Sequence, residues 1–259
     1  MIRRPGRRTT TVTLAALVVV AAAAGGLAVG RGSPTIPPLA VGAELSPPRA
    51  VPPIPLSGAD GRRVTLPSYR GRVVVLAPFL SLCAEQCPIT TGAFMQAAHR
   101  IAAAGLGRKV VFVEASVDPW RDTPRRLRAF QQLIHARGVV MLTGTRPHVR
   151  AFWRFFGVWY HRVAEDSPPD IDWWTHKPQR FDVVHTDAVL IIDPAGRWRV
   201  AALGMADPGG RLSPPLRGLL NTDGLRNLRA PQEPWSVPQL LQDIAHVLGQ
   251  PIAHAVDGG

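Results

Sequence analysis

Cys83 and Cys87 are the residues best suited to chemistry in this 259-residue chain. They are its only two cysteines. They follow an apolar run over 73–80 that predicts a buried strand, and they precede a segment over 90–104 that predicts a helix. Reactive groups in open α/β sheets gather at the carboxyl ends of strands, and a helix N-terminus favours thiolates. If the helix begins near Cys83, both sulfur atoms lie on one face, where they can form a disulfide or bind one metal ion.

The close spacing of the cysteines also bears on their role. An exported protein can hold a disulfide, but a loop this short constrains the unfolded chain little. A purely structural disulfide would therefore stabilise the fold weakly. We expect the pair to serve chemistry, with an inert disulfide as the alternative.

The N-terminus has the pattern of an export signal. Residues 1–8 contain four arginines and no acid, and residues 9–30 carry no charge. The apolar run is long enough to cross a bilayer once, and the arginines should keep its start on the cytoplasmic side. No sharp A-x-A cleavage site follows. We expect 1–32 to be a signal anchor or a signal peptide, which places the domain on the extracytoplasmic side of the cell membrane, with a cleaved, secreted or periplasmic form as the alternative.

The charge of the chain limits its partners. The net charge is +12, and the excess is almost all arginine spread along the sequence. No dense basic run is interleaved with aromatic residues, which argues against nucleic-acid binding. Anionic lipid or an acidic partner suits this charge better.

The remaining chain reads as one α/β domain with short additions. Residues 33–52 are rich in proline and predict an extended tether, 53–250 predict the domain, and 251–259 predict a flexible tail. Strand and helix patterns alternate within the domain and end in a hairpin over 187–203 and a helix over 237–248. That order predicts a central mixed sheet flanked by helices.

Some segments beside the cysteines are harder to interpret. Asp118 and Asp122 resemble a catalytic carboxylate pair, but we interpret them as turn and cap residues, with Asp122 or Thr123 capping the helix over 124–136. The segment 160–182 predicts a long lid beside the site. Its tryptophans are expected to shield a metal, contact a partner or pack on the domain. Its histidines, His161 and His176, are weaker candidate ligands, and 206–234 has no clear assignment.

Several motifs together resemble one known family. They are Cys83-Ala84-Glu85-Gln86-Cys87-Pro88, Ser116-Val117-Asp118-Pro119-Trp120-Arg121-Asp122-Thr123-Pro124, Leu142-Thr143-Gly144-Thr145, Phe156-Gly157-Val158, and His185-Thr186 before Leu190-Ile191-Ile192-Asp193-Pro194-Ala195-Gly196. In this order, over about residues 50–250, they resemble the SCO/SenC family of thioredoxin-fold copper proteins. The resemblance implies a thioredoxin-like fold with an N-terminal membrane anchor, and copper bound by Cys83, Cys87 and His185. It also implies a role in assembling the dinuclear copper site of cytochrome c oxidase, whose copper-bearing subunit, or another copper protein, would be the partner.

The chemistry of these side chains agrees with copper. Two thiolates and one imidazole form a soft ligand set that suits Cu(I) and can hold Cu(II). Three ligands leave a position open to a partner's ligand, whereas zinc usually takes a fourth protein ligand. His185 precedes a predicted strand, from which its ring could reach Cys83 and Cys87.

Three functions remain open at this stage. The first is a copper chaperone, and the second is a thiol–disulfide oxidoreductase that uses Cys83 and Cys87 to keep a partner's copper-binding cysteines reduced. Whether the protein is an enzyme depends on this choice. The third is a peroxidase of the peroxiredoxin type, which is disfavoured because Leu80 occupies the place of the expected threonine.

Overall fold

A computed structural model of the protein describes residues 35–252. Within them, no helix is both long and apolar enough to cross a membrane. The predicted signal anchor and the end of the predicted tail lie outside the described residues.

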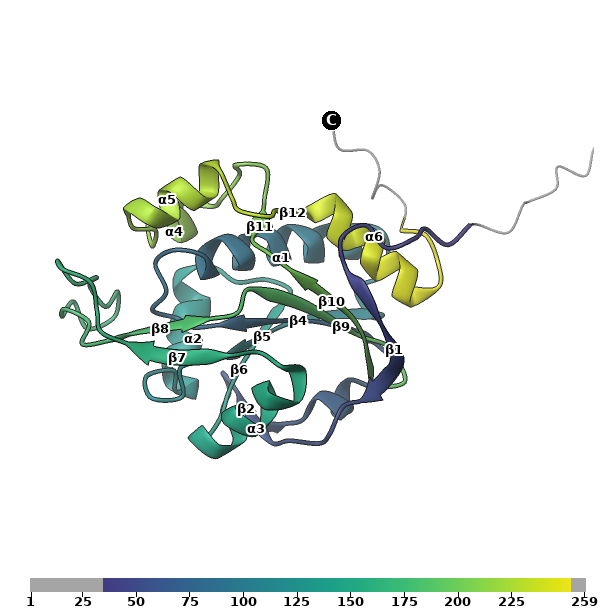
Figure 1. Ribbon diagram of the computed structural model, residues 1–259, viewed down its shortest axis with the longest axis horizontal. Coiled ribbons are helices and arrows are strands. Elements are labelled where there is room, and N and C mark those ends of the chain that lie inside the picture. Colours follow the sequence, from purple (N-terminus) through teal and green to yellow (C-terminus); the bar gives the residue numbers. More distant parts are fainter. Residues whose placement is uncertain (1–34, 253–259) are drawn as a thin grey trace, which may run out of the picture. The chain divides into compact units, whose positions relative to one another are not determined.

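The fold is built on a mixed sheet of eight strands in the order β1-β10-β9-β4-β5-β6-β2-β3 (Figure 1). In chain order these strands are β1 (Ala43–Ala50), β2 (Leu56–Gly58), β3 (Arg63–Val64), β4 (Val73–Phe79), β5 (Val110–Ser116), β6 (Val139–Thr143), β9 (Ala188–Ile192) and β10 (Arg197–Leu203). Strands β4, β5 and β6 are parallel, and β9 joins β4 antiparallel. The α/β class and the mixed sheet were both predicted from the sequence.

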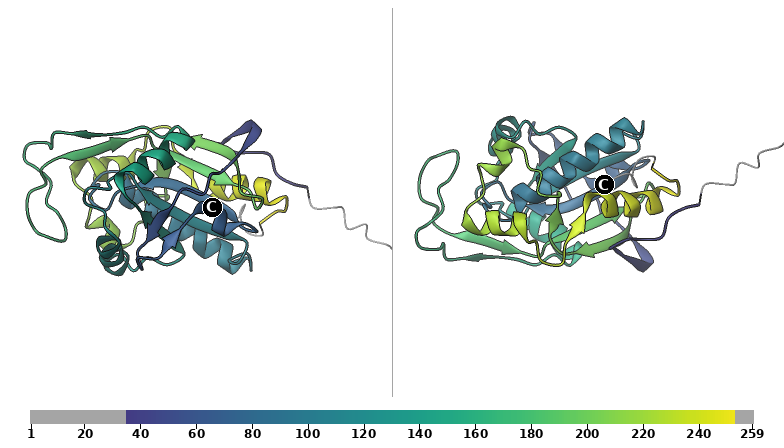
Figure 2. Two further views of the ribbon diagram at one scale, coloured as in Figure 1. Left: turned by 90° about the horizontal axis from the view of Figure 1, so that it is seen from below. Right: turned by 90° about the horizontal axis from the view of Figure 1, so that it is seen from above.

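Helices cover both faces of this sheet (Figures 1 and 2). The helices are α1 (Cys87–Ala103), α2 (Pro124–Leu133), α3 (Arg146–Phe156), α4 (Pro214–Arg217), α5 (Thr222–Arg229) and α6 (Val237–Leu248), with a 3-10 turn, η1 (Leu66–Tyr69). Side chains of β4 alternate between two cores: Val73 and Val75 pack with α1 and α6, whereas Val74 and Leu76 pack with α2 and α3. Burial on both faces explains why β4 is apolar at every position.

The helix ends follow local rules that the sequence contains. Thr123 and Thr145 accept the backbone N–H groups of Arg126 and His148 and so cap α2 and α3. Helix α6 begins with a capping box between Ser236 and Gln239. These caps place α2 and α6 within a few residues of their predicted limits.

The predicted tether is wrong over residues 43–50. These residues form β1, which pairs antiparallel with β10 at the edge of the sheet. The approach to β1 is also bound to the domain, because the buried Asp243 carboxylate of α6 accepts the N–H groups of Ala40 and Gly42 at 2.5 and 2.8 Å. The domain therefore begins before residue 53.

The unassigned segment 206–234 folds against α1. It contains β11 (Ala206–Asp207), α4 and α5, and β11 pairs in parallel with β12 (Trp235–Ser236). Leu212 and Leu216 approach α1 at Gly92, which is buried. The segment is thus part of the domain rather than a free insertion.

Replacement of Asp243 tests the attachment of residues 40–50. Asp243→Ala should lower the free energy of unfolding by about 2–4 kcal/mol, because it leaves two backbone N–H groups without their acceptor. Asp60→Ala, at an exposed turn, is the control and should change stability by less than about 1 kcal/mol. Equal effects in denaturant titrations would show that this approach to β1 is not held to the domain.

Candidate metal-binding and thiol site

The two cysteines lie where β4 turns into α1. The strand ends at Phe79, residues 80–86 form a turn, and Cys87 is the first residue of the helix. Cys83 therefore precedes the helix, and the expectation that both cysteines lie on one helical face is wrong. The turn brings their sulfur atoms together instead, and both thiols are free.

Cys83 is the more activated thiol. Its sulfur atom receives the N–H groups of Gln86 and Cys87 at 3.4 and 3.3 Å, at the N-terminus of α1. The Cys87 thiol, followed by backbone N–H groups, lowers the pKa of Cys83 and outweighs the opposing effect of burial. Cys83 is also the less buried of the two. Such a half-buried thiol of lowered pKa is suited to act as a nucleophile or a metal ligand.

Cys87 has the opposite character. Burial raises its pKa well above the usual value, and the neighbouring Cys83 raises it further. Its sulfur atom is 3.5 Å from the N–H group of Leu80, which is the one backbone donor that favours the thiolate. Cys83 therefore loses its proton more readily than Cys87.

His185 reaches these cysteines from a separate ribbon. Strands β7 (Tyr160–Val163) and β8 (Asp182–His185) pair with each other outside the main sheet. The Nε2 atom of His185 lies 3.8 Å from the Cys87 sulfur, and its Nδ1 atom lies 3.1 Å from the carbonyl oxygen of Thr186. A carbonyl oxygen only accepts, so Nδ1 carries the proton and Nε2 presents a lone pair towards the thiol.

The three side chains fit a soft metal ion by type, and they need a small movement to bind it. Two sulfur atoms and an imidazole nitrogen suit Cu(I), and a fixed Nδ1–H is a usual partner of a metal-binding histidine. Within residues 35–252, no three His, Cys, Asp or Glu side chains already stand at metal-binding distances. Metal–ligand bonds are near 2 Å, so the groups must move inward on binding.

A buried carboxylate holds the turn that carries Cys83. Asp122 accepts both the N–H and the hydroxyl of Ser81, the latter at 2.5 Å, and the hydroxyl of Ser116 at 2.6 Å. Burial, followed by the nearby Asp118, raises the pKa of Asp122 to about 7. Of the two cap candidates from the sequence, Thr123 caps α2 and Asp122 does not.

The segment between β7 and β8 lies against the same turn, as the predicted lid requires. Trp173 donates its indole N–H to the carbonyl of Ser81 at 2.7 Å, and Gln179 donates to the carbonyl of Leu82 at 3.1 Å. Trp173 also packs on Phe130, with ring centroids 5.5 Å apart. The segment thus packs onto the domain and covers the turn.

Two arginines bind the segment between β7 and β8 to the domain. Arg121 donates to Gln179 and to the carbonyl of Phe181, while its Nε pairs with Asp118 at 2.5 Å. Arg126 pairs with Asp172 through two hydrogen bonds. The sequence suggested none of these contacts, although Asp118 and Arg121 lie within the motif 116–124 and the partners of Arg126 and Arg121 on the other side lie within 160–182.

A small cavity opens beside the cysteines. It has a volume of about 130 Å³ and is lined by Cys83, Gln86 and His185 together with acidic side chains. The acids are Glu85, Asp170, Asp182 and Asp187. Burial, and then the surrounding carboxylates, raises the pKa of Glu85. The mouth of the site is acidic although the chain as a whole is strongly basic.

The remaining candidate histidines do not belong to this cavity. His161 stacks on Trp159 in another pocket, and His176 is exposed with a φ of 56°. Neither lines the cavity of the cysteines. His185 is the sequence-predicted histidine that the fold brings to Cys87.

The SCO1/SenC family model matches residues 43–211, which include both cysteines and His185. The chain belongs to the SCO1/SenC family. No curated protein matched the sequence.

Solved structures of this family share the fold at low sequence identity. The apo Sco1 protein of Thermus thermophilus has a TM-score of 0.52 and 23% identity, covering 76% of this chain and 98% of that one. Copper-bound ScoI of Arabidopsis thaliana has a TM-score of 0.51 and 22% identity over 60% and 88% of the two chains. Copper-bound ScoI of Bradyrhizobium japonicum has a TM-score of 0.50 and 18% identity over 70% and 98%. These likenesses support the predicted thioredoxin-like architecture of the SCO1/SenC domain.

The difference between the two thiols predicts a difference in their reactivity. In the reduced protein near pH 7, iodoacetamide should modify Cys83 at least about tenfold faster than Cys87, because the thiolate is the nucleophile and Cys83 ionises first. Timed quenching and peptide mass spectrometry measure both rates. In denaturant the two rates should converge, and faster modification of Cys87 in the folded protein would contradict the assignment.

Glu114 predicts a pH dependence of stability. It is fully buried in β5, accepts the Thr91 hydroxyl at 2.8 Å, and has its pKa raised to about 8 by burial. The folded state therefore binds the proton more tightly than the unfolded state, whose pKa is near 4.5. The contribution of Glu114 to stability should be greatest below pH 4.5 and be lost as the pH rises to about 8, by up to about 5 kcal/mol.

The variant Glu114→Gln should remove this contribution. Urea titrations between pH 4.5 and 8 should show a flatter profile for the variant than for the wild type. Thr91→Val is a control, because it deletes the hydrogen bond but keeps the buried carboxyl. An unchanged slope in Glu114→Gln would mean that Glu114 is ionised in the folded protein.

Proposed function

We propose that this chain binds copper through Cys83, Cys87 and His185 and delivers it to, or matures, the dinuclear copper site of cytochrome c oxidase. The observation that carries the proposal is the 3.8 Å approach of His185 Nε2 to Cys87 Sγ across 98 positions of sequence. Membership in the SCO1/SenC family, and the copper-bound relatives from Arabidopsis thaliana and Bradyrhizobium japonicum, support it. The charge-free run over 9–30 supports an extracytoplasmic domain held by one membrane anchor.

The three ligands suit an ion that must be passed on. Cys83 is the better prepared for copper because its lowered pKa makes the thiolate easier to form, whereas the raised pKa of Cys87 makes the loss of its proton on binding harder. The acidic mouth attracts cations to the cavity. A three-coordinate ion leaves one side free for a ligand of the receiving protein, and the half-buried Cys83 marks that side.

A second function is favoured by the contrast between the thiols. In thiol–disulfide exchange, the Cys83 thiolate attacks a partner disulfide and releases one partner sulfur as a thiolate. Cys87, after losing its proton, then attacks Cys83 of the mixed disulfide, which releases the second partner thiolate and leaves the Cys83–Cys87 disulfide. Two electrons pass to the partner. A lowered pKa at the more accessible thiol and a raised pKa at the buried one suit this order of attack.

Copper binding separates these functions. In the reduced full-length protein, Cys83→Ser and Cys87→Ser should each abolish tight binding of one Cu(I). His185→Ala should weaken Cu(II) binding by at least about tenfold and Cu(I) binding much less, because two thiolates already satisfy Cu(I). Competition with chelators and the Cu(II) absorption spectrum measure both effects.

The matched control replaces a histidine outside the cavity. His176→Asn introduces a residue that also tolerates the positive φ of this position. It should leave the affinities for Cu(I) and Cu(II) unchanged. If His185→Ala retains the wild-type Cu(II) spectrum while Cys83 and Cys87 still form a disulfide, the three-ligand copper site is refuted and the oxidoreductase function takes its place.

A further inference from the structure

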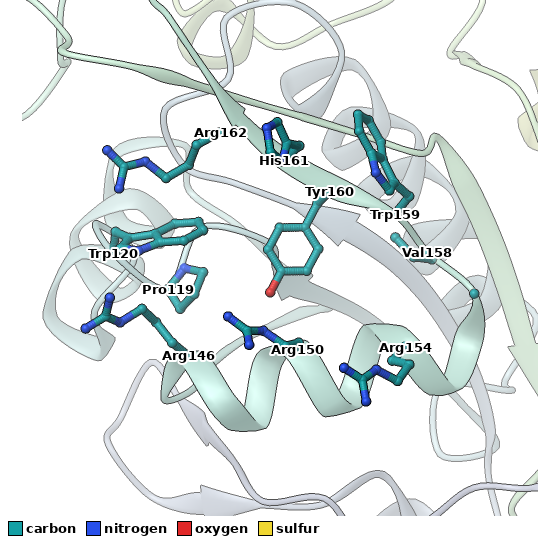
Figure 3. Close-up of a pocket in the computed structure, with 11 residues that line it drawn as sticks. Pro119, Trp120, Arg146, Arg150, Arg154, Val158, Trp159, Tyr160, His161 and Arg162 are labelled. Carbon is teal, nitrogen blue, oxygen red and sulfur yellow. The ribbon is translucent and has the colours of Figure 1, made fainter.

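A second pocket, with a volume of about 560 Å³, lies between α3 and β7 and is rich in arginine (Figure 3). Arg146, Arg150 and Arg154 stand on successive turns of α3 and line its lower side. Arg162 of β7 lies across from them. The pocket is separate from the cavity of the cysteines.

The helical arginines have no acidic partner within the part of the chain that the structure describes. None of the three takes part in any ion pair there. All three residues are exposed. Like charges four residues apart on a helix repel each other, so this row is unfavourable for α3 alone. An anionic ligand would relieve that repulsion.

The spacing of the row suits an extended polypeptide. Residues four apart on a helix rise by about 6 Å, so the row extends over about 12 Å. In an extended chain, alternate side chains on one face are about 6.6–6.8 Å apart. Acidic residues at alternate positions would therefore meet successive arginines, whereas one phosphate group is too small to reach the whole row.

The opposite side of the pocket is aromatic. Trp120, Trp159 and Tyr160 line it, and Trp159 is 59% exposed, which is unusual for so large an apolar side chain. The Arg162 guanidinium lies 5.2 Å from the Trp120 ring centroid, and this cation–π contact stabilises the aromatic side of the pocket. Aromatic residues and arginine are the types most enriched where proteins bind proteins. A recess with one cationic and one aromatic side fits a peptide better than a flat lipid surface.

The pocket adjoins the candidate copper site through the strand pair β7 and β8. Tyr160, which lines the pocket, pairs with His185 across β7 and β8. Residues paired in this way have Cβ atoms only about 4.5–5.5 Å apart. A segment bound beside Tyr160 would lie next to the strand that carries the histidine ligand.

We propose that this pocket binds an extended acidic segment of a partner protein, with its carboxylates on the arginine row and its backbone beside the aromatic wall. The identity of the partner rests on the proposed function, since it would be the protein that exchanges copper or electrons with Cys83 and Cys87. The binding site itself follows from the unpaired arginines, their spacing and the exposed tryptophan.

The test uses the full-length protein in non-ionic detergent and two amidated peptides of equal composition. One alternates glutamate and alanine, and the other has its glutamates in one block. Calorimetric titration should show that the alternating peptide binds more tightly and that its affinity falls as salt is raised. The combined variant Arg146→Gln, Arg150→Gln and Arg154→Gln should weaken its binding at least about tenfold.

A matched variant separates the pocket from the overall charge. Arg63→Gln, Arg108→Gln and Arg137→Gln together remove the same charge from exposed positions outside the pocket. This variant should bind the alternating peptide as the wild type does. Trp159→Ala should also weaken binding and leave the fold intact, because Trp159 is mostly exposed.

Other ligands are distinguished by competition. Inorganic phosphate and mixed micelles containing phosphatidylglycerol should each fail to displace the peptide at equal phosphate concentration. Equal loss of affinity in both arginine variants, no preference between the peptides, or displacement by either phosphate source would overturn the proposal. Cu(I) binding is measured in the same samples: peptide binding without copper binding refutes the proposed function alone, and copper binding without peptide binding refutes this inference alone.

Discussion

The geometry of the candidate site depends on the buried carboxylate of Asp122. It accepts hydrogen bonds from Ser81, just after β4, and from Ser116, at the end of β5, while its backbone carbonyl accepts the hydroxyl of Thr143, at the end of β6. One residue thus ties together the carboxyl ends of three parallel strands. A buried polar group left without these donors would be costly, so the donors and the carboxylate hold each other in place. The sheet sets the position of the cysteine turn before any metal binds.

The same turn creates two unequal thiols from one short motif. Cys83 faces the free N–H groups at the start of α1, whereas Cys87 is packed into the core behind it. Copper binding and disulfide exchange both need one accessible thiolate, and a disulfide between Cys83 and Cys87 would remove both sulfur ligands at once. The two proposed functions are therefore coupled: the oxidation state of the pair decides whether copper can bind. His185 is the group that only the copper function requires.

The sequence predicted the elements that obey strong local patterns and missed those that depend on distant partners. The apolar run of β4 and the capped helices α2 and α6 lie close to their predicted limits. Strand β1 was taken for a tether because Pro47 and Pro48 interrupt it, yet prolines are tolerated at a sheet edge. The start of α1 was uncertain. Asp122 resembled a cap because it precedes α2 in the sequence, whereas its hydrogen-bond donor Ser81 is 41 residues away. The distance between His185 and Cys87 likewise depends on the whole sheet, and only family resemblance suggested it.

The ribbon of β7 and β8 determines how the third ligand can move. A two-stranded ribbon is only marginally stable by itself, and within residues 35–252 neither strand pairs with the main sheet. Its position therefore depends on side-chain contacts, chiefly those of Trp173 and Gln179 with the carbonyls of the cysteine turn and those of Arg121 beneath them. These contacts bind the segment to the turn itself, so the histidine and the cysteines are held to the same support. The 3.8 Å separation of His185 Nε2 and Cys87 Sγ leaves room for one ion bonded to both atoms, so a small shift of the ribbon can set the imidazole around that ion without disturbing the sheet.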